Sequence, residues 1–406
     1  MSSAKRTIHT ITAAEMRGIN RASILELIRC HGTISRTQIA AELSVSLPTV
    51  MRISNDLMRA GLVIENGQKE SSGGRKRNLL QFNGAAHLVI GIDLGGTKIY
   101  GAAANLNGEL LHEISYTHYQ TQAEQSLAVV CQMIDELLRF AEGAALPVRG
   151  IGLGVPGVVQ PESGVVTIAP ALDWTDFPLK ERLAGRYSLP IVIENDVNLA
   201  ALGEVWFGTD ADINNLVLLA IGTGIGAGVV INGAVYGGAH HLAGEVGYFL
   251  PDRSHLGKAY PGFGALEQLA SGTGIAGRGR AARQAMMESG LRPAEDAQAL
   301  TAEEVFLAAR RGEAWAEAVL QETIDYLAQL VAAVTLVVDP DAILLGGGVA
   351  KSADLLIEPI QRRLQGAIPL IPPIQASKLG YRAAAFGAII QVLRITTNYY
   401  SLQRYA

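Results

Sequence analysis

Two glycine-rich turns, each set between two apolar runs, constrain the fold of this chain more than any other feature. They read GIDLGGTKIY at residues 91–100 and IGTGIGAG at residues 221–228. Glycine has no Cβ to block close approach, so such a turn can aim backbone N–H groups and a threonine hydroxyl at phosphate oxygens. A single turn of this kind fits an ordinary tight hairpin better. Two of them in two halves of one domain can grip a phosphate chain from both sides, and the pair therefore predicts a nucleotide cleft.

The residues expected at the phosphates are Asp93, Gly95, Gly96, Thr97 and Lys98 in the first turn and Gly222, Thr223 and Gly224 in the second. Asp93 is also expected to hold Mg²⁺, usually through water. A third stretch, LLGGGVA at residues 344–350, exposes backbone at Gly346, Gly347 and Gly348 that could pack against an adenine ring. The alternative for this stretch is an ordinary turn between a strand and a helix.

A carboxylate follows the apolar run IVIEN at residues 191–195, where a helix is expected to begin. At such a junction Asp196 could be a buried general base. It could equally cap its own helix, and the residues alone leave both interpretations open.

The body of the chain, from about residue 84 onward, alternates strand-like runs with helical ones, which is typical of an α/β fold. Strands are expected at LVIGID, IYGAAANL, ELLHEISYTH, GIGLGV, IVIEN, LVLLAI, GAGVVI and AILLGG. Helices are expected over about residues 126–141, 266–289, 302–311 and 313–338.

The first 82 residues have a different pattern, with three helices expected over residues 17–30, 36–43 and 47–62. Ser35 is a good N-cap for the second helix, and Pro48 is tolerated in the first turn of the third. A short helix, a turn and a longer helix are the helix-turn-helix arrangement, in which the start of the last helix enters the major groove of DNA. Two strands, expected at residues 62–65 and 78–82, flank a glycine-rich loop with a basic tip, as in a winged helix-turn-helix. A small three-helix bundle for protein contacts is the alternative.

The residues expected to meet DNA come from the helices and from the tip of the wing. They are Ser35, Arg36, Ser46, Pro48, Thr49, Arg52, Arg75, Lys76 and Arg77. Residues 1–80 hold 12 of the 33 Lys and Arg but only 6 of the 38 Asp and Glu, so this segment carries +6 and the remainder −11. A basic head on an acidic body indicates that only the head meets a polyanion.

Composition excludes several other classes of protein. The 406 residues are too many for one ordinary domain, and 49% are hydrophobic, enough for a large core. No apolar run approaches a membrane span, and the N-terminus has no apolar signal segment. The only two cysteines, Cys30 and Cys131, fall in separate segments. A cytoplasmic protein without membrane contact is expected.

Taken together, these motifs resemble the ROK family of sugar kinases and sugar-responsive repressors, and the resemblance covers nearly the whole chain. It implies a winged helix-turn-helix over residues 1–82, then a two-lobed, actin-like (RNase H-like) ATPase and sugar kinase fold. The smaller lobe is expected over residues 84–197 with the C-terminal helix 383–406, and the larger lobe over residues 198–382. The implied sugar contacts are Gly157, Asn195, Asp196, Glu245, Tyr248 and Glu267, with Asp196 as catalytic base and Mg·ATP as cofactor.

The sequence departs from the family pattern at the zinc site. The family places a His three residues after the first Glu and three Cys before the second, and here those positions hold Tyr248, Lys258, Tyr260 and Ala265. A structural Zn²⁺ needs about four such ligands, so no zinc or other structural metal is expected. Packing by Tyr248, Tyr260 and Phe263 is expected to hold the loop instead. A second departure is Ala171, where the family often has a sugar-binding Asn.

The head decides between two functions that the resemblance allows. A repressor whose cleft binds a sugar and changes operator affinity is expected, because a metabolic kinase has no use for a DNA-reading head. The alternative is an ATP-dependent hexose kinase, alone or combined with regulation, because the first phosphate turn is intact. A homodimer or a dimer of dimers on a palindromic operator is implied.

Overall fold

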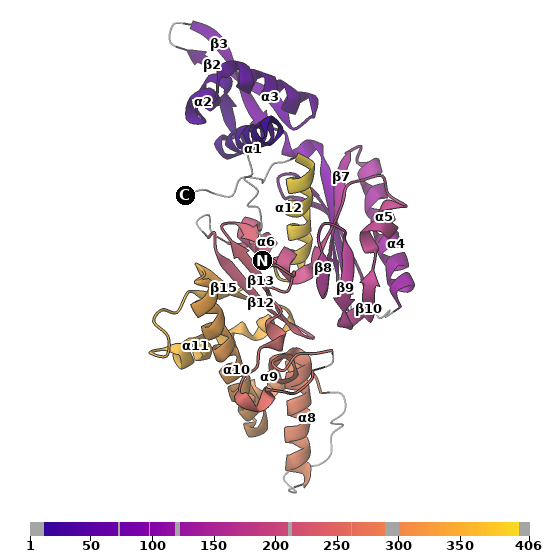
Figure 1. Ribbon diagram of the computed structural model, residues 1–406, viewed down its shortest axis with the longest axis vertical. Coiled ribbons are helices and arrows are strands. Elements are labelled where there is room, and N and C mark those ends of the chain that lie inside the picture. The colour runs from indigo at the N-terminus through magenta and orange to yellow at the C-terminus, as the bar shows by residue number, and fades with distance from the viewer. Residues whose placement is uncertain are drawn as a thin grey trace, which may run out of the picture.

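The computed structural model describes residues 12–71, 74–96, 98–117, 122–209, 213–260, 262–288 and 300–397. Along its long axis a small head is followed by two α/β lobes (Figure 1). This is the winged helix-turn-helix and two-lobed α/β organisation that the sequence predicts.

The head packs three helices against a three-stranded sheet. Its elements are α1 (Ala13–His31), β1 (Thr33–Ser35), α2 (Arg36–Glu42), α3 (Leu47–Arg59), β2 (Val63–Ser71) and β3 (Gly74–Phe82), with strand order β1-β3-β2. The hydroxyl of Ser35 accepts from the backbone N–H of Gln38, whose side chain reaches back to Ser35, so the expected N-cap is confirmed as a capping box. The apolar face of α3 buries Val50, Ile53 and Leu57.

The wing differs from the expectation in two ways. Its strands continue to Ser71 and from Gly74, so residues 74–77, expected in the loop, belong to β3. Antiparallel pairing satisfies backbone groups whatever the side chains are, and a polar sequence does not prevent it. The break expected after the first helix is itself a short strand, β1, paired with β3.

The smaller lobe is built on a five-stranded sheet of order β11-β7-β4-β5-β6. Its strands are β4 (Leu88–Leu94), β5 (Lys98–Asn105), β6 (Leu110–Thr117), β7 (Val148–Val155) and β11 (Ile191–Asn195). Helices α4 (Ala123–Gly143) and α5 (Leu179–Ala184) cover one face, and α12 (Ala383–Thr397) packs against β4 and β7 on the other (Figure 1). A three-stranded sheet that the sequence did not indicate adds β8 (Val158–Gln160), β9 (Val165–Ala169) and β10 (Trp174–Phe177).

The larger lobe has a sheet of order β14-β13-β12-β15-β16 with helices around it. Its strands are β12 (Leu216–Ile221), β13 (Ile225–Ile231), β14 (Ala234–Val235), β15 (Ala342–Gly346) and β16 (Ile374–Ala376). Its helices are α7 (Glu267–Ala270), α8 (Gly272–Glu288), α9 (Ala302–Arg310), α10 (Ala314–Val338) and α11 (Ala353–Leu364). The single helix expected from residue 266 is interrupted at Ser271, because Gly272 N–H bonds the carbonyl of Gly222 and ties the chain to the second glycine turn.

Helix α6 (Asp196–Gly203) crosses α12 between the two sheets. The backbones approach so closely that a Cβ on Gly387 would lie 1.8 Å from the carbonyl oxygen of Leu199, and one on Gly203 would lie 2.2 Å from that of Ala383. Only glycine fits at such a crossing. The π-helical turn η3 (Glu204–Gly208) follows α6 and leads into the larger lobe.

A single cluster of buried side chains continues from the head into the smaller lobe. It joins Ile24, Val50 and Leu80 of the head with Val89 and Ile389 of the body. Arg149 at the start of β7 adds a polar tie, since its Nη2 donates to the carbonyl of Ala60 at 2.5 Å and approaches His87 Nε2. Burial, and then the Arg149 charge, lower the pKa of His87 to about 4, so its ring is neutral and accepts. Head and body therefore share a packed joint.

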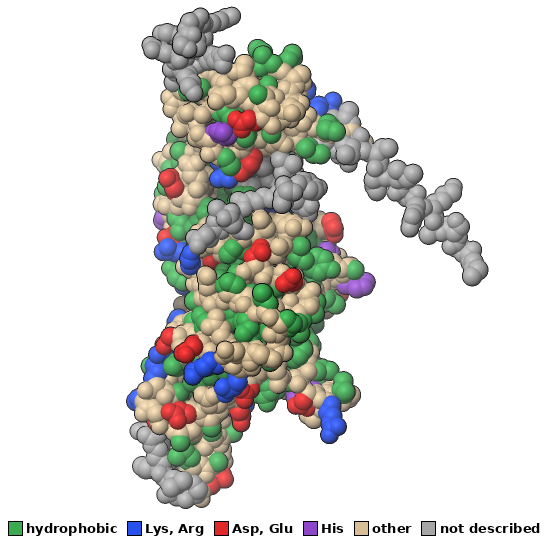
Figure 2. All heavy atoms as spheres, turned by 90° about the vertical axis from the view of Figure 1, so that its left-hand side faces the viewer, with side chains coloured by type: hydrophobic (Ala, Val, Ile, Leu, Met, Phe, Trp, Pro, Cys, Tyr) green, Lys and Arg blue, Asp and Glu red, His purple; other side chains and the backbone are tan. Residues whose placement is uncertain are grey.

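Acidic and basic side chains are interspersed over the lower half of the molecule on the face shown in Figure 2. This mixture is typical of a solvated surface and marks no binding site there.

Candidate functional site

A small cavity lies where the two lobes meet, and residues from both lobes line it. The lining residues are Gly157, Val159, Glu194, Asn195, Val197, Asn198, Gly226, Ala227, His241, Ala243, Gly244 and Glu245. Four of the six expected sugar contacts belong to it or border it: Gly157, Asn195 and Glu245 line the cavity, and Asp196 stands beside Asn195 at the start of α6.

Asn195 is fixed by two hydrogen bonds. Its Nδ2 donates to the carbonyl of Gly157 at 2.9 Å, and its Oδ1 accepts from the N–H of Asn198 at 2.9 Å. The N-cap of α6 is thus Asn195, while Asp196 Oδ1 accepts from the first-turn N–H of Val197 at 2.9 Å. Gly157 has a φ of +94°, and a Cβ there would lie 2.1 Å from the carbonyl oxygen of Ile168. Glycine is needed at this position to bring the loop to the cavity.

Asp93 of β4 and Asp196, the residue directly after β11, form a carboxylate pair across the intervening strand β7. Gly154 of β7 lies opposite Asp93 in the sheet, and a Cβ on it would lie 3.2 Å from the Cα of Asp196. Burial, and then the nearby Asp196 charge, raise the pKa of Asp93, while Lys98 lowers it. Burial also raises the pKa of Asp196. Two carboxylates held this close fit a divalent cation, which would relieve their repulsion.

Glu245 and Glu267 lie near each other on the larger-lobe side. Burial, followed by the charges of Glu267 and Asp196, raises the pKa of Glu245. Both oxygens of Glu267 already accept backbone N–H groups, from Ile225 at 2.9 Å and from Gly264 at 2.6 Å. Glu267 therefore shapes the wall of the site in this structure.

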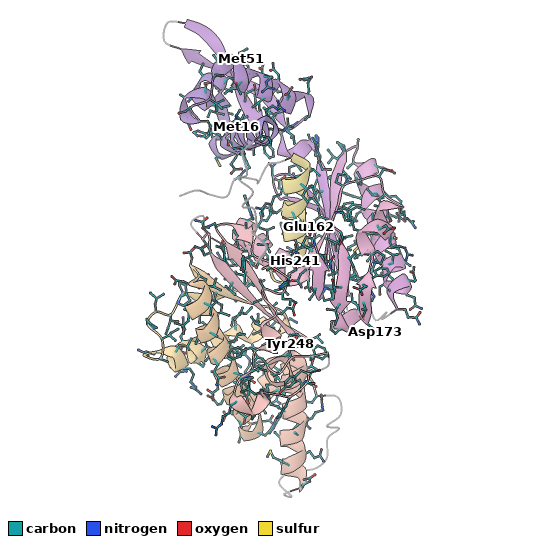
Figure 3. All side chains as sticks on the ribbon, viewed as in Figure 1. Met16, Met51, Glu162, Asp173, His241 and Tyr248 are labelled. Atoms are coloured by element: carbon teal, nitrogen blue, oxygen red, sulfur yellow. The ribbon has the colours of Figure 1, made fainter. Side chains whose placement is uncertain are left out.

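Tyr248 stands apart from the cavity and is 46% exposed (Figure 3). Its hydroxyl donates to the carbonyl of Gly262 at 3.0 Å, and Tyr260 bonds His255 Nδ1 at 2.6 Å. These contacts brace the loop whose zinc ligands are missing, with two of the three side chains expected to do so. Within the described residues no cluster of three or more His, Cys, Asp or Glu is arranged to hold a metal, and the absence of zinc stays a prediction.

The glycine turns lie where the sequence places them, at hairpin bends. Gly95 N–H bonds the carbonyl of Lys98 and Gly222 N–H that of Gly224, both at 2.9 Å. Gly347 has a φ of +77°, and a Cβ there would lie 2.4 Å from the carbonyl oxygen of Ile221, so the third glycine stretch sits beside the second turn. Gly222 and Gly348 have no atom within 4 Å of a built Cβ, which leaves open space over the backbone, and Thr223 is exposed. Thr97 lies outside the described residues.

Three polar residues of the cavity were not singled out from the sequence: Glu194, Asn198 and His241. Glu194 Oε1 accepts from the N–H of Asn195 and from Asn198 Nδ2. Glu194 directly precedes Asn195 on the strand, so the alternation of side chains along a strand could have indicated it. Asn198 lies about one helical turn after Asn195, so helix periodicity could have indicated it as well. His241 comes from an irregular loop, where no such periodicity exists.

The start of α3, which the sequence predicts to face DNA, is exposed. Ser46, Pro48 and Arg52 are exposed there, and Thr49 is partly so, as the pattern predicts. Two apolar side chains that the sequence did not indicate are also exposed at this end of α3, Leu47 at 38% exposure and Met51 at 48%. Figure 3 labels Met51. Apolar atoms at a groove-facing position suit the thymine methyl group.

Arg36 occupies a different place from the one expected. Its Nε donates to Ser54 Oγ at 3.0 Å, its Nη1 pairs with Glu65 at 2.8 Å, and its side chain is only 18% exposed. It ties α2 to α3 and β2. Ser35 is likewise buried as a helix cap. The side chains of Arg75, Lys76 and Arg77 lie outside those that the structure describes.

Replacing Arg52 with alanine is expected to weaken operator binding by on the order of tenfold, because an arginine at the start of a recognition helix contributes about 1–3 kcal/mol. Fluorescence anisotropy with labelled operator at fixed salt measures it. Arg59→Ala is the matched control, since Arg59 ends the same helix, is 79% exposed and pairs with Asp56. Equal losses for the two variants would contradict the assignment of the groove-facing end.

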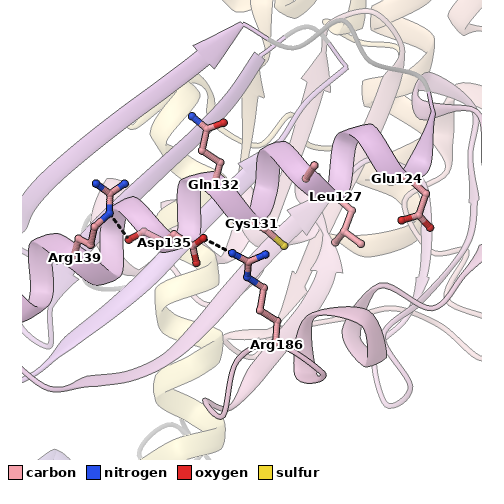
Figure 4. A pocket seen from close by; sticks show the side chains of 8 residues that line it. Glu124, Leu127, Cys131, Gln132, Asp135, Arg139 and Arg186 are labelled. Atoms are coloured by element: carbon pink, nitrogen blue, oxygen red, sulfur yellow. Dashed lines mark hydrogen bonds and ion pairs between the residues drawn. The ribbon is translucent and has the colours of Figure 1, made fainter.

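A second, shallow hollow lies on the outer face of the smaller lobe, over α4 (Figure 4). Three of its four charged lining residues are in ion pairs, Arg186 with Asp135 at 2.5 Å and Glu124 with Arg182 at 2.6 Å, and the fourth, Arg139, donates to the carbonyl of Asp135. These pairs fasten the segment after α5 to α4 and give the hollow a structural role.

Comparison with known proteins relates both parts of the chain to described families. Residues 89–395 match the ROK family model, and residues 19–64 match the model "Winged helix-turn-helix DNA-binding". The xylose repressor of Caldicellulosiruptor bescii is 29% identical over 388 residues, covering 93% of this chain and 96% of that protein.

Two solved structures place this similarity in three dimensions. A ROK family transcriptional regulator, a homologue of the E. coli MLC protein, superposes with a TM-score of 0.81 at 26% identity over 96% of this chain and 98% of that one. A ROK family glucokinase from Streptomyces griseus in complex with glucose and AMPPNP has a TM-score of 0.64 at 28% identity, covering 75% of this chain and 98% of that one. None of the helices in the described ranges is long and apolar enough to cross a membrane.

Proposed function

Because this chain belongs to the ROK family, we propose that it is a sugar-responsive transcriptional repressor, in which a sugar in the cavity between the lobes changes the affinity of the head for operator DNA. The observation that carries this proposal is the packed joint between the head and the smaller lobe, made of one continuous hydrophobic cluster and the Arg149–Ala60 hydrogen bond. The smaller lobe also forms one side of the cavity. A kinase without a regulatory role needs no such joint.

Strand β7 spans the distance between the two sites. Arg149 at its start holds the carbonyl of Ala60, directly after α3. The last residues of β7 lead into the loop that contains Gly157, and the carbonyl of Gly157 accepts from Asn195 Nδ2 at the cavity. A sugar that binds the open and closed arrangements of the lobes with different affinity therefore shifts the head through a rigid element.

The charge of the cavity indicates an uncharged sugar. Asp93, Glu194, Asp196, Glu245 and Glu267 all lie in or beside it, and the electrostatic partners that lower carboxyl pKa values here are Lys98 and His241. A phosphate group would add negative charge beside buried carboxylates, which costs several kcal/mol unless it is paired. Hydroxyl groups can instead donate to these oxygens.

The partner of the head is double-stranded DNA, and the assembly is a homodimer or a dimer of dimers that reads a palindromic operator. Two heads related by a twofold axis require half-sites separated by about one or two helical turns. Operator affinity measured at fixed salt, with and without uncharged sugars and their 6-phosphates, tests the proposal. If no sugar changes that affinity, the proposed function is wrong.

A second activity, sugar phosphorylation, is favoured by one specific observation: the buried carboxylates of Asp93 and Asp196 act on each other where the first glycine turn follows β4, and a second glycine turn follows β12 of the other lobe. Bound Mg·ATP would supply the phosphoryl group and the divalent cation. The chain's own part is to hold phosphates at the turns and the cation near Asp93. Asp196, whose pKa is raised by burial, takes the proton from the attacking hydroxyl.

Replacing Asp196 with asparagine is expected to abolish any sugar-dependent release of ADP, because the amide cannot accept the hydroxyl proton. A coupled ADP assay over a panel of sugars measures this, and the wild-type chain without sugar is the blank. Asn at position 196 keeps nearly the same shape, so operator binding should be unchanged. Turnover that survives the substitution would exclude Asp196 as the base.

A further inference from the structure

The loop between β14 and η4 (Val246–Tyr248) brings an imidazole to the cavity from an unusual backbone conformation. His241 has a φ of +55°, a left-handed conformation that few non-glycine residues adopt. Several other non-glycine residues with positive φ in the described ranges follow helices or sit in a hairpin turn, as Ser44, Ala145, Asn232 and Asp339 do. His241 lines the cavity (Figure 3). Such conformations concentrate at functional sites, where the surrounding structure holds them.

Across the cavity, Asn198 presents an oxygen that the protein leaves without a partner, beside the buried carboxylate of Glu194. Asn198 is 8% exposed, and its Oδ1 is buried with no hydrogen-bond partner in the described structure. Glu194 is 7% exposed, and its Oε1 accepts from both the N–H of Asn195 and Asn198 Nδ2. A buried acceptor without a donor costs about 1–3 kcal/mol, so a ligand hydroxyl that donates to it gains affinity.

His241 and Glu194 come from different lobes and act on each other through the cavity. Glu194 ends β11 of the smaller lobe, and His241 lies in the larger lobe. Burial raises the pKa of Glu194, while hydrogen bonds from the Asn195 N–H and the Asn198 side chain, and then the charge of His241, lower it. No hydrogen bond of the His241 ring is present among the described residues, so its ring nitrogens stay open to a ligand.

We propose that His241 is a specificity-determining residue that contacts the sugar directly, with one hydroxyl held between its imidazole and the Glu194–Asn198 pair. This rests on the proposed function and extends it, since a sugar bridged in this way binds both lobes at once and favours their closed arrangement. His241 brings an imidazole to the cavity, whereas the hydroxyl of Tyr248, one of the expected sugar contacts, bonds the carbonyl of Gly262.

The experiment is isothermal titration of the full chain with D-xylose, D-glucose, D-mannose and N-acetyl-D-glucosamine, followed by operator titration with whichever sugar binds. His241→Ala is expected to weaken binding of that sugar about tenfold or more and to remove its effect on operator affinity. Without sugar, operator affinity should match the wild type. The neighbouring His240 is exposed and does not line the cavity, so His240→Ala is the matched control with unchanged sugar affinity.

A third variant separates recognition from a structural role. Glycine adopts positive φ without cost, so His241→Gly should keep or raise the melting temperature while losing sugar affinity as His241→Ala does. If the wild type binds a sugar and both His241 variants bind it equally well, the inference about His241 is overturned and the proposed function stands. If no sugar changes operator affinity in the wild type, the proposed function and this inference fall together.

Discussion

Replacing Gly387 with alanine is expected to destabilise the chain by about 3 kcal/mol, at the upper end of what overpacking costs. The new Cβ would lie 1.8 Å from the carbonyl oxygen of Leu199 and 2.5 Å from its carbon. These are backbone atoms of α6, which cannot turn away as a flexible side chain can. Helices α6 and α12 must therefore separate, and this movement also disrupts the packing of α12 against β4 and β7. Urea unfolding followed by circular dichroism measures the loss.

Gly143→Ala is the control for the same change of side chain. Gly143 ends α4, has no positive φ, and a Cβ on it would meet no atom within 4 Å. Alanine there should be neutral or slightly stabilising, because it reduces the freedom of the unfolded chain. A Gly387→Ala variant as stable as Gly143→Ala would show that α6 and α12 do not pack as closely as described.

Replacing Glu204 with alanine is expected to cost about 3 kcal/mol and to weaken the coupling between sugar and operator. Glu204 is fully buried, and its carboxylate accepts from the Ser377 hydroxyl at 2.5 Å and from the N–H groups of Leu379 at 2.9 Å and Lys378 at 3.3 Å. Glu204 lies directly after α6, where the chain leaves the smaller lobe, and Ser377 to Leu379 lie just before α12, where the chain returns to it. Without these hydrogen bonds, the two chain segments that connect the lobes are no longer tied to each other.

Thermal unfolding and operator titration with and without sugar measure the two effects of Glu204→Ala. Glu204→Gln should fall between the wild type and the alanine variant, since one amide oxygen can still accept. Glu358→Ala is the control, because that side chain is 75% exposed and its pair with Arg362 spans 3.7 Å. If Glu204→Ala is as stable as the wild type and sugar still changes its operator affinity fully, the Glu204 hydrogen bonds play no part in the coupling.

The sequence predicted most of the elements that carry the cleft, because their signals are local. Apolar runs ending in glycine gave β4, β12 and β15, and the Asn195-Asp196 junction gave the start of α6. The three-stranded sheet of β8, β9 and β10 escaped prediction, since its strands are short and pair only through tertiary contacts. The length of the wing strands was also missed, because backbone pairing there overrides a polar sequence.

In the cavity too, the residues that local motifs mark could be predicted, and those placed there by long-range contacts could not. Gly157, Asn195 and Glu245 were predicted by motif and do lie together. His241 was not, since nothing in HHLAG indicates a left-handed residue facing a strand end some 47 positions earlier in the chain. Arg36 was expected at DNA for its charge, yet its partners Ser54 and Glu65 lie about 20 to 30 residues away and hold it inside the head.

The central claim is that one free-energy coupling joins the sugar cavity to the head. Fluorescence anisotropy of a labelled operator, titrated with the full chain at fixed salt, tests it directly when repeated at saturating uncharged sugar. Couplings of this kind are about 1–3 kcal/mol, so operator affinity is expected to change by about 5- to 150-fold. By reciprocity, sugar affinity is expected to change by the same factor when operator is bound. An operator affinity that stays the same with a sugar shown to bind would contradict it.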